Sequence, residues 1–276
     1  MDKTKVLYVS QEITPYLEAS EISTASRELP QGVQEKGREI RVFMPRYGCI
    51  NERRHQLHEV IRLSGMNLII NDNDHPLILK VASIPAARMQ VYFIDNEDFF
   101  QRKAALCDSK GKFFEDNDER SLFFIRGVIE TVKKLGWAPD VIHCHGWMTA
   151  LMPAYLKKII NDDPHFSDAK VVFSAYGTGF DGSLEKGMTK KLEMEGFDPK
   201  DLELIADPTF ENLTRFAMHY SDGIIQGSSD LNGEIKTYID KTGKPVMEFA
   251  DADALVDACS EFYDKVLEEN GVLVEE

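Results

Sequence analysis

The hydrophobic positions of the chain fall into short runs separated by longer periodic stretches. Five runs rich in β-branched residues predict strands at Val6–Ser10, Glu39–Met44, Val141–His145, Lys170–Ala175 and Gly223–Gln226. Several of these runs are apolar at successive positions, which indicates strands covered on both faces. Because they alternate with helical patterns, we predict an α/β fold: a Rossmann-like, mostly parallel sheet with helices on both faces.

The stretch between residues 56 and 100 has a different pattern. Three strand-like runs, Leu57–Ile70, Leu77–Ile84 and Met89–Ile94, are separated by short segments of turn-forming residues and proline. Gaps of this kind favour hairpin connections. We therefore expect an antiparallel meander inserted in, or appended to, the parallel sheet.

Two later stretches have the 3–4 residue spacing of apolar positions that is typical of helices. The first runs from about Asp116 to Leu135, and the second from about Thr149 to Ile160. Residues 177–205 contain five glycines and have no clear period, so we expect a loop there.

The composition of the chain limits the kinds of partner that it is expected to bind. The chain has 276 residues, a net charge of −15 and a sequence pI near 5.0. This charge disfavours sequence-independent binding to nucleic acid or to anionic membranes. The N-terminal residues lack the apolar segment of a signal peptide, and no apolar run reaches membrane-spanning length, so we expect a cytoplasmic protein.

The cysteines give no sign of a cofactor. Cys49, Cys107, Cys144 and Cys259 lie far apart, and none belongs to a Cys-x-x-Cys pair. Neither a zinc ribbon nor a disulfide framework is therefore indicated. We expect isolated buried thiols, no metal site and no cofactor.

The densest group of chemically capable side chains lies at the end of the strand-like run Val141–His145. His143 and His145 share one face of that strand, because strand side chains alternate, and Trp147 and Met148 follow it. Three interpretations are open. A metal site would need further ligands that the neighbouring sequence does not offer. The histidines could be structural, hydrogen-bonded at a strand end. In a sugar site, Trp147 would support a pyranose face and the imidazoles would bond hydroxyls.

Three blocks of sequence resemble the bacterial starch and glycogen synthases. Residues 140–157, DVIHCHGWMTALMPAYLK, resemble the family's D-I-I-H-A-H-D-W-H-T-A-L-x-P-x-Y-L-K. Residues 135–140, LGWAPD, resemble its L-G-W-x-P-D, and residues 37–47, GREIRVFMPRY, resemble its G-H-x-V-R-V-x-M-P-x-Y. The order and spacing of the blocks agree with that family, and the resemblance covers about residues 5–235.

The resemblance implies the N-terminal, Rossmann-like half of a two-domain GT-B glycosyltransferase of the family 5 type. Members of that family transfer glucose from ADP-glucose or UDP-glucose to an α-1,4-glucan. They carry K-x-G-G-L-x-D-V near the N-terminus, where the lysine and the glycines approach the phosphates of the sugar nucleotide. The aligned stretch here contains Glu18, Ser20, Glu21 and Thr24. Because two carboxylates repel a diphosphate, this degenerate phosphate loop argues against binding of ADP-glucose.

Other positions that face substrate in that family also differ. Gly146 replaces an aspartate, and Met148 replaces the histidine that the resemblance places against the transferred sugar. Residues 174–182, SAYGTGFDG, lack the histidine and the asparagine of the family's T-I-H-N-L-A-Y-Q-G. No catalytic residue is assigned. The sugar- or acceptor-facing candidates are His143, His145, Trp147, Met148 and Tyr176.

The C-terminal part is much shorter than the family's second domain. We expect a synthase-like domain over residues 1–242 and an acidic tail with a helix over residues 243–276. The tail either corresponds to the last helix of a GT-B synthase, which packs back on the first domain, or is an unrelated amphipathic helix. Its predicted buried stripe is Leu255, Cys259, Phe262 and Val266.

Three functions are compatible with these residues. The leading expectation is a non-catalytic family member with a glucan-binding or regulatory role in glycogen metabolism. Its partner would be an α-glucan such as glycogen, or an enzyme of glycogen metabolism, bound around Trp147, Tyr176 and Phe180. The second is a partial glycosyltransferase completed by another chain. The third is a different small-molecule enzyme on the half-fold, with His143 or His145 as acid or base.

Overall fold

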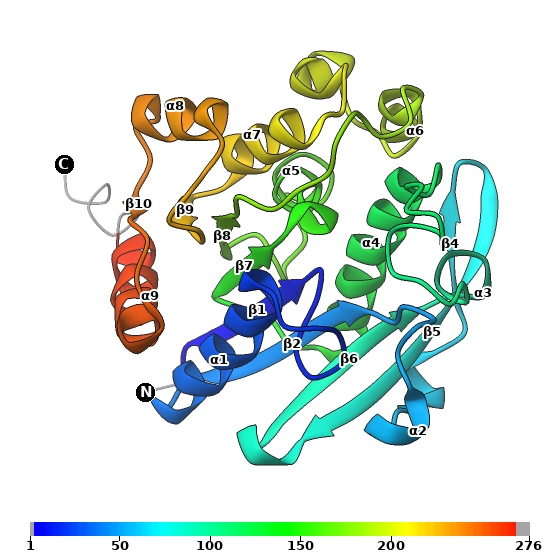
Figure 1. Ribbon diagram of the computed structural model, residues 1–276, viewed down its shortest axis with the longest axis horizontal. Helices are drawn as coiled ribbons and strands as arrows, with labels where there is room; N and C mark the ends of the chain where they lie inside the picture. Colours follow the sequence, from blue (N-terminus) through cyan, green and yellow to red (C-terminus); the bar gives the residue numbers. More distant parts are fainter. Residues whose placement is uncertain (1–2, 269–276) are drawn as a thin grey trace.

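A single sheet forms the centre of the molecule (Figure 1). The computed structural model describes residues 3–268. Within them, ten strands are joined in the order β10-β9-β8-β7-β1-β2-β6-β5-β3, and β4 pairs with β5 outside this path. The strands are β1 (Lys5–Ser10), β2 (Glu39–Pro45), β3 (His58–Glu59), β4 (Met66–Ile70), β5 (Asn73–Ile84), β6 (Met89–Asp95), β7 (Val141–His145), β8 (Lys170–Ala175), β9 (Gly223–Gln226) and β10 (Val246–Met247).

The parallel part of the sheet confirms the predicted α/β fold. β1 lies at its centre, paired in parallel with β2 on one side and with β7 on the other. β8, β9 and β10 continue the parallel arrangement beyond β7. β1, β7 and β8 are buried almost throughout, as the continuous apolar runs indicate.

The predicted meander is part of the same sheet. β6 pairs in parallel with β2 and antiparallel with β5, so the hairpin continues the parallel sheet directly. The single run expected over Leu57–Ile70 is divided into β3, a 3₁₀ turn (η1, Ile61–Leu63) and β4. Asn71 and Asp72 have positive φ values of 50° and 59°, and they form the tight turn between β4 and β5.

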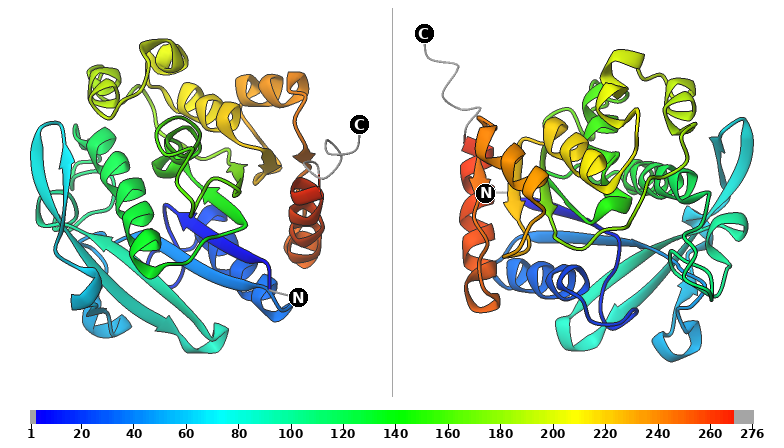
Figure 2. Two further views of the ribbon diagram at one scale, coloured as in Figure 1. Left: turned by 180° about the vertical axis from the view of Figure 1, so that it is seen from behind. Right: turned by 45° about the horizontal axis from the view of Figure 1, so that its top comes forward.

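Helices cover both faces of the sheet, as Figure 1 and the view from behind in Figure 2 show. α1 and α9 lie on one side, and α4, α5 and α7 lie on the other. The helices are α1 (Glu21–Glu35), α2 (Glu52–His55), α3 (Glu97–Phe100), α4 (Asn117–Leu135), α5 (Met152–Lys158), α6 (Met188–Met194), α7 (Phe210–Tyr220), α8 (Gly233–Lys241) and α9 (Ala252–Glu268), with shorter 3₁₀ segments at η2 (Pro85–Ala87), η3 (Trp147–Thr149) and η4 (Pro199–Ile205). Among residues 3–268, none of these helices combines the length and apolar character needed to cross a bilayer.

Two sequence expectations about helices differ from the structure. The helix expected from Thr149 starts three residues later, because η3 comes first and α5 begins at Met152, with Pro153 in its first turn. The stretch 177–205 contains α6 and η4 where we expected a loop. Local signals account for η4: Asp198 caps it by accepting a hydrogen bond from the Lys200 backbone N–H at 2.9 Å.

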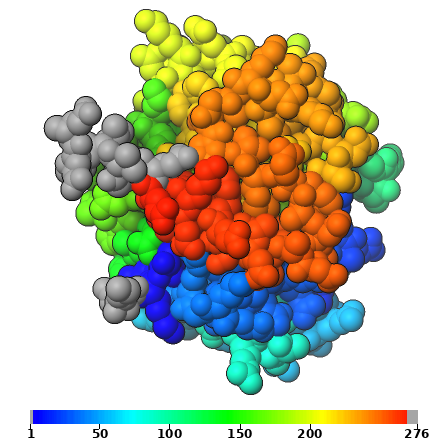
Figure 3. Space-filling view, turned by 90° about the vertical axis from the view of Figure 1, so that its left-hand side faces the viewer, coloured from blue at the N-terminus to red at the C-terminus, as the bar shows by residue number. Residues whose placement is uncertain are grey.

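α9 packs against α1 and brings the C-terminal part of the described chain beside its first helix (Figure 3). Of its predicted stripe, Cys259, Phe262 and Val266 are buried and Leu255 is half-buried. The two helices approach closely at Gly32, where an added Cβ would lie 2.5 Å from a methyl group of Val256. The proposed division of the chain near residue 242 stays a prediction, although α9 does pack back on the sheet domain.

Candidate functional site

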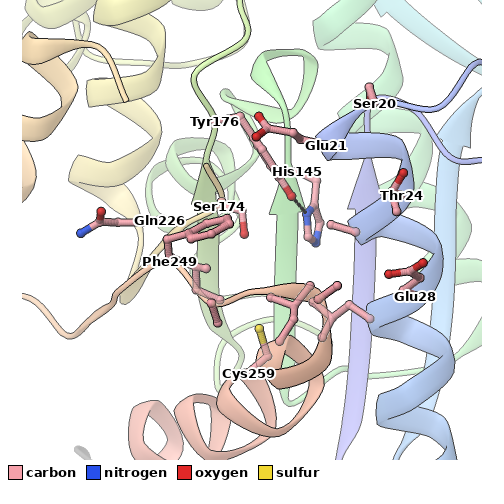
Figure 4. A pocket seen from close by; sticks show the side chains of 17 residues that line it. Ser20, Glu21, Thr24, Glu28, His145, Ser174, Tyr176, Gln226, Phe249 and Cys259 are labelled. Atoms are coloured by element: carbon pink, nitrogen blue, oxygen red, sulfur yellow. Dashed lines mark hydrogen bonds between the residues drawn. The ribbon is translucent and has the colours of Figure 1, made fainter. Parts of the chain in front are cut away.

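A cavity of about 350 Å³ opens beyond the carboxyl ends of β7, β8 and β9. The N-terminal half of α1 closes one side, and residues 249–259 close another (Figure 4). Ligands of open α/β sheets bind at these strand ends. The cavity is therefore the candidate site.

The cavity joins two sets of residues that the sequence singled out separately. Ser20, Glu21 and Thr24 of the degenerate loop line it from α1. His145 and Tyr176 line it from the ends of β7 and β8. Glu18, His143, Trp147 and Met148 do not line it.

The two histidines of β7 are buried side by side, with ring centroids 3.9 Å apart. His143 is fully buried, with Nδ1 2.7 Å from the Tyr263 hydroxyl of α9 and Nε2 2.7 Å from Ser174 Oγ. His145 Nδ1 lies 2.8 Å from the Tyr176 hydroxyl. His145 Nε2 is buried without a hydrogen-bond partner in the described part of the chain.

Burial keeps both imidazoles neutral. It lowers the pKa of His143 well below its usual range, and the neighbouring His145 lowers it further. Burial also lowers the pKa of His145 to about 3. Neither side chain therefore supplies an imidazolium near neutral pH, either as a general acid or as a counter-charge for phosphate.

The N-terminus of α1 is occupied by the chain's own side chains. Ser20 caps the helix, its Oγ accepting from the Ser23 backbone N–H at 3.0 Å, and Ser23 Oγ in turn accepts from the Ser20 backbone N–H at 2.8 Å. Ser23 Oγ also donates to the carbonyl of the exposed Glu18 at 2.9 Å. Glu21 accepts a hydrogen bond from Ser228 Oγ at 2.5 Å. The helix end that would meet a phosphate is thus capped and flanked by a carboxylate.

Trp147 and Met148 turn away from the cavity. Trp147 is 3% exposed and packs against Phe113 and Phe180, with ring centroids 5.5 and 5.0 Å away. Met148 is fully buried, and its backbone N–H donates to Gln11 Oε1 at 3.3 Å. In this arrangement the indole ring is buried against neighbouring rings and does not present an open surface.

A second, more polar surface lies over Trp147. Phe113 and Phe180 stack there with centroids 4.9 Å apart and an interplanar angle of 23°. Cavities of about 430 and 290 Å³ flank this pair. Their polar lining includes Arg102, Asp108, Lys112, Asp181, Glu211 and Asn232. We call this surface the Phe113–Phe180 strip.

Comparison with known proteins decides the family. A sequence model described as the starch synthase catalytic domain matches residues 5–245. The chain belongs to the starch synthase catalytic-domain family. Glycogen synthase of Chlorobium limicola is 35% identical over 238 residues, covering 83% of this chain and 49% of that protein. Glycogen synthase of Chlorobium chlorochromatii is 39% identical over 182 residues, covering 66% of this chain and 37% of that protein.

A solved structure supports the fold. The catalytic domain of starch synthase IV from Arabidopsis thaliana, bound to ADP and acarbose, superposes with a TM-score of 0.72 at 16% sequence identity. The match covers 92% of this chain and 53% of that one. The chain thus has the fold of part of a starch synthase and spans about half the length of the first relatives it matches.

Sequence reasoning missed one wall of the cavity. Phe249, Leu255 and Cys259 line it, although the sequence places them far from the family motifs. Ser174 and Gln226 also line it, and both end strands. The rule that ligands bind at the carboxyl ends of strands identifies these two residues from the sequence. For the segment from 249 to 259 the sequence predicts a helix with a buried stripe, but it does not predict that this segment lies against the cavity.

Proposed function

We propose that this chain is a non-catalytic member of the starch synthase family that binds α-glucan. The observation that carries the proposal is the N-terminus of α1. It is capped by Ser20 and Ser23 and flanked by the Glu21 carboxylate, which is held by Ser228. A sugar nucleotide needs free N–H groups and a positive charge at such a helix end. The site therefore supports loss of glucosyl transfer.

The Phe113–Phe180 strip supports the glucan part of the proposal. Sugar-binding surfaces combine an aromatic ring that packs on apolar C–H groups with polar side chains that bond hydroxyls. Here a half-buried aromatic pair lies between carboxylate, amide and cationic side chains. The related starch synthase IV structure contains acarbose, a sugar-like molecule, which is consistent with an α-glucan as the ligand class.

The first test follows ADP release from ADP-glucose with glycogen as acceptor. We expect no release above the background by the purified chain over several hours. Sustained turnover by the chain alone would contradict the proposal. Turnover only after addition of a second polypeptide would instead support a partial transferase completed by another chain.

The second test is native affinity electrophoresis in gels containing glycogen. We expect glycogen to retard the wild-type chain, and we expect Phe180→Leu to reduce the retardation at least threefold, because the change removes the flat ring but keeps an apolar side chain. Phe249→Ala is the matched control, since Phe249 is 39% exposed but lies at the other cavity. Equal mobility with and without glycogen would overturn the glucan assignment.

A further inference from the structure

We propose that the cavity between α1, the ends of β7–β9 and residues 249–259 binds a neutral, mostly apolar small molecule. Its oxygen would accept a hydrogen bond from His145 Nε2. This inference goes beyond the glucan-binding function and does not depend on it.

The walls of the cavity set the class of ligand. Three elements contribute apolar side chains: Leu29 from α1, Ile225 from β9, and Phe249, Leu255 and Cys259 from the C-terminal segment. The volume of about 350 Å³ lies in the range of small-molecule sites. A cavity of roughly 150 Å³ can hold benzene, so this one has room for a two-ring molecule.

An unpaired polar atom on a side chain that lines the cavity indicates where the ligand would be held. His145 is 1% exposed, and its Nε2 has no partner among the described residues. The Tyr176 hydroxyl has His145 Nδ1 as its hydrogen-bond partner, at 2.8 Å. If the Tyr176 hydroxyl donates its proton to His145 Nδ1, the hydrogen-bonding capacity of Nδ1 is satisfied. The proton of the neutral imidazole then lies on Nε2. A buried N–H without an acceptor is unfavourable, and a ligand oxygen would remove that cost.

The charges around the cavity select against anions. Glu21 and Glu28 line it from α1, and no lysine or arginine of residues 3–268 does. Figure 4 shows Thr24 and Glu28 along the α1 side, with Phe249 and Gln226 opposite. Because carboxylates repel phosphate and sulfonate groups, the ligand is expected to be neutral. This requirement separates the site from one for a sugar nucleotide.

Two naphthalene probes, one neutral and one anionic, test the proposal by fluorescence titration. Prodan is neutral and carries a ketone oxygen, whereas 1-anilinonaphthalene-8-sulfonate is anionic. We expect prodan to bind saturably at one site per chain, with a blue shift of its fluorescence emission. We expect the sulfonate to bind at least tenfold more weakly. Absence of saturable prodan binding, or equal affinity for the two probes, would overturn the proposal.

Variants locate the probe. Ala25→Phe fills the cavity from α1, and we expect it to weaken prodan binding at least tenfold. Ala86→Phe, at an exposed position outside the cavity, is the control and should leave binding unchanged. His145→Leu should weaken binding about tenfold by removing the donor. If His145→Leu does not fold, Ala25→Phe still tests the location of the site. Unchanged prodan binding by Ala25→Phe would show that the probe binds outside this cavity and would overturn the proposal.

A charge variant checks the selectivity independently. Glu21→Gln combined with Glu28→Gln should strengthen sulfonate binding at least threefold and leave prodan binding within twofold. If sulfonate binding does not change, the carboxylates do not set the selectivity and the neutral-ligand assignment fails.

Discussion

His143 and His145 occupy the same face of a buried strand, and each is stabilised as a neutral ring. Their partners are hydroxyl groups: Tyr263 and Ser174 for His143, and Tyr176 for His145. A hydroxyl can donate or accept, so it matches a neutral imidazole without requiring a charge. The arrangement favours a structural and ligand-contacting role over acid–base catalysis.

The stability of the fold should therefore depend on pH. Unfolded histidines bind protons below about pH 6.5, whereas folded His145 does so only near pH 3, because burial lowers its pKa to about 3. The contribution of each buried histidine is complete above pH 6.5 and is lost as the pH falls. We expect the free energy of unfolding to decrease between pH 6.5 and 5 by up to about 1.4 kcal/mol per pH unit for each histidine.

Urea unfolding at pH 7, 6 and 5 measures this dependence. His145→Gln should make the free energy of unfolding depend less steeply on pH, because one of the two buried imidazole rings is removed. His58→Gln is the control at an exposed histidine and should leave the steepness unchanged. Equal steepness in wild type and His145→Gln would contradict the burial argument.

At the scale of elements, α1 and α9 pack together and approach closely at Gly32. A Cβ at Gly32 would lie 2.5 Å from Val256. Gly32→Ala alone should lower the free energy of unfolding by about 1–2 kcal/mol through overpacking. In a Val256→Ala background the same change should raise it by up to about 1 kcal/mol, because alanine is the better helix former.

A double-mutant cycle in urea measures this change of sign. Gly233→Ala in α8 is the control, because the added methyl group has open space around it. It should change the free energy of unfolding equally in the wild-type and Val256→Ala backgrounds. Additive effects of Gly32→Ala and Val256→Ala would show that the two helices do not pack as described.

The start of α1 leads to a prediction about nucleotide binding. Glu18→Lys combined with Glu21→Gly removes two carboxylates and adds a cation, and we expect the dissociation constant for ADP to fall at least tenfold. Isothermal titration calorimetry measures it. Glu35→Lys with Asp240→Asn changes the net charge equally but away from the loop, and should leave ADP binding as in wild type. An equal gain in ADP affinity in both variants would mean that the overall charge of the chain, and not the loop, controls ADP binding.

The strands could be predicted from the sequence because their signal is local. Runs such as Val6–Ser10 and Val141–His145 are apolar at nearly every position, and the structure places β1 and β7 there. The site was less predictable. Strand alternation correctly places His143 and His145 on one face, but it stops at His145, so the direction of Trp147 depends on the turn at Gly146, where φ is 84°. Sequence spacing also gives no information on Phe249, whose position depends on long-range packing.

At the scale of the whole molecule, hydrogen bonds between distant parts of the chain join α9 to the central strands of the sheet. The Tyr263 hydroxyl of α9 lies 2.7 Å from His143 Nδ1 and 3.2 Å from the Tyr8 hydroxyl. Tyr263→Phe would leave His143 Nδ1 buried without a partner, and we expect the free energy of unfolding to fall by about 1–3 kcal/mol. Tyr220→Phe, at a residue that is only half-buried, should change the free energy of unfolding by less than about 0.5 kcal/mol.

Native-state hydrogen exchange shows whether this loss is global. In Tyr263→Phe, the slowest-exchanging amides of β1 and β7 should lose protection. This loss should equal the decrease in the free energy of unfolding measured in urea. A loss confined to the amides of α9 would mean that the helix opens by itself and does not stabilise the sheet.

The bond between Tyr8 and Tyr263 spans 255 positions of the sequence, and it has a consequence for synthesis. A ribosome makes β1 and β7 long before it makes α9. Until residue 263 has left the ribosome, His143 either stays in water or is buried without one of its two partners. Contacts of such long sequence separation close slowly. The central strands of the nascent chain therefore reach their final packing only once α9 has been made.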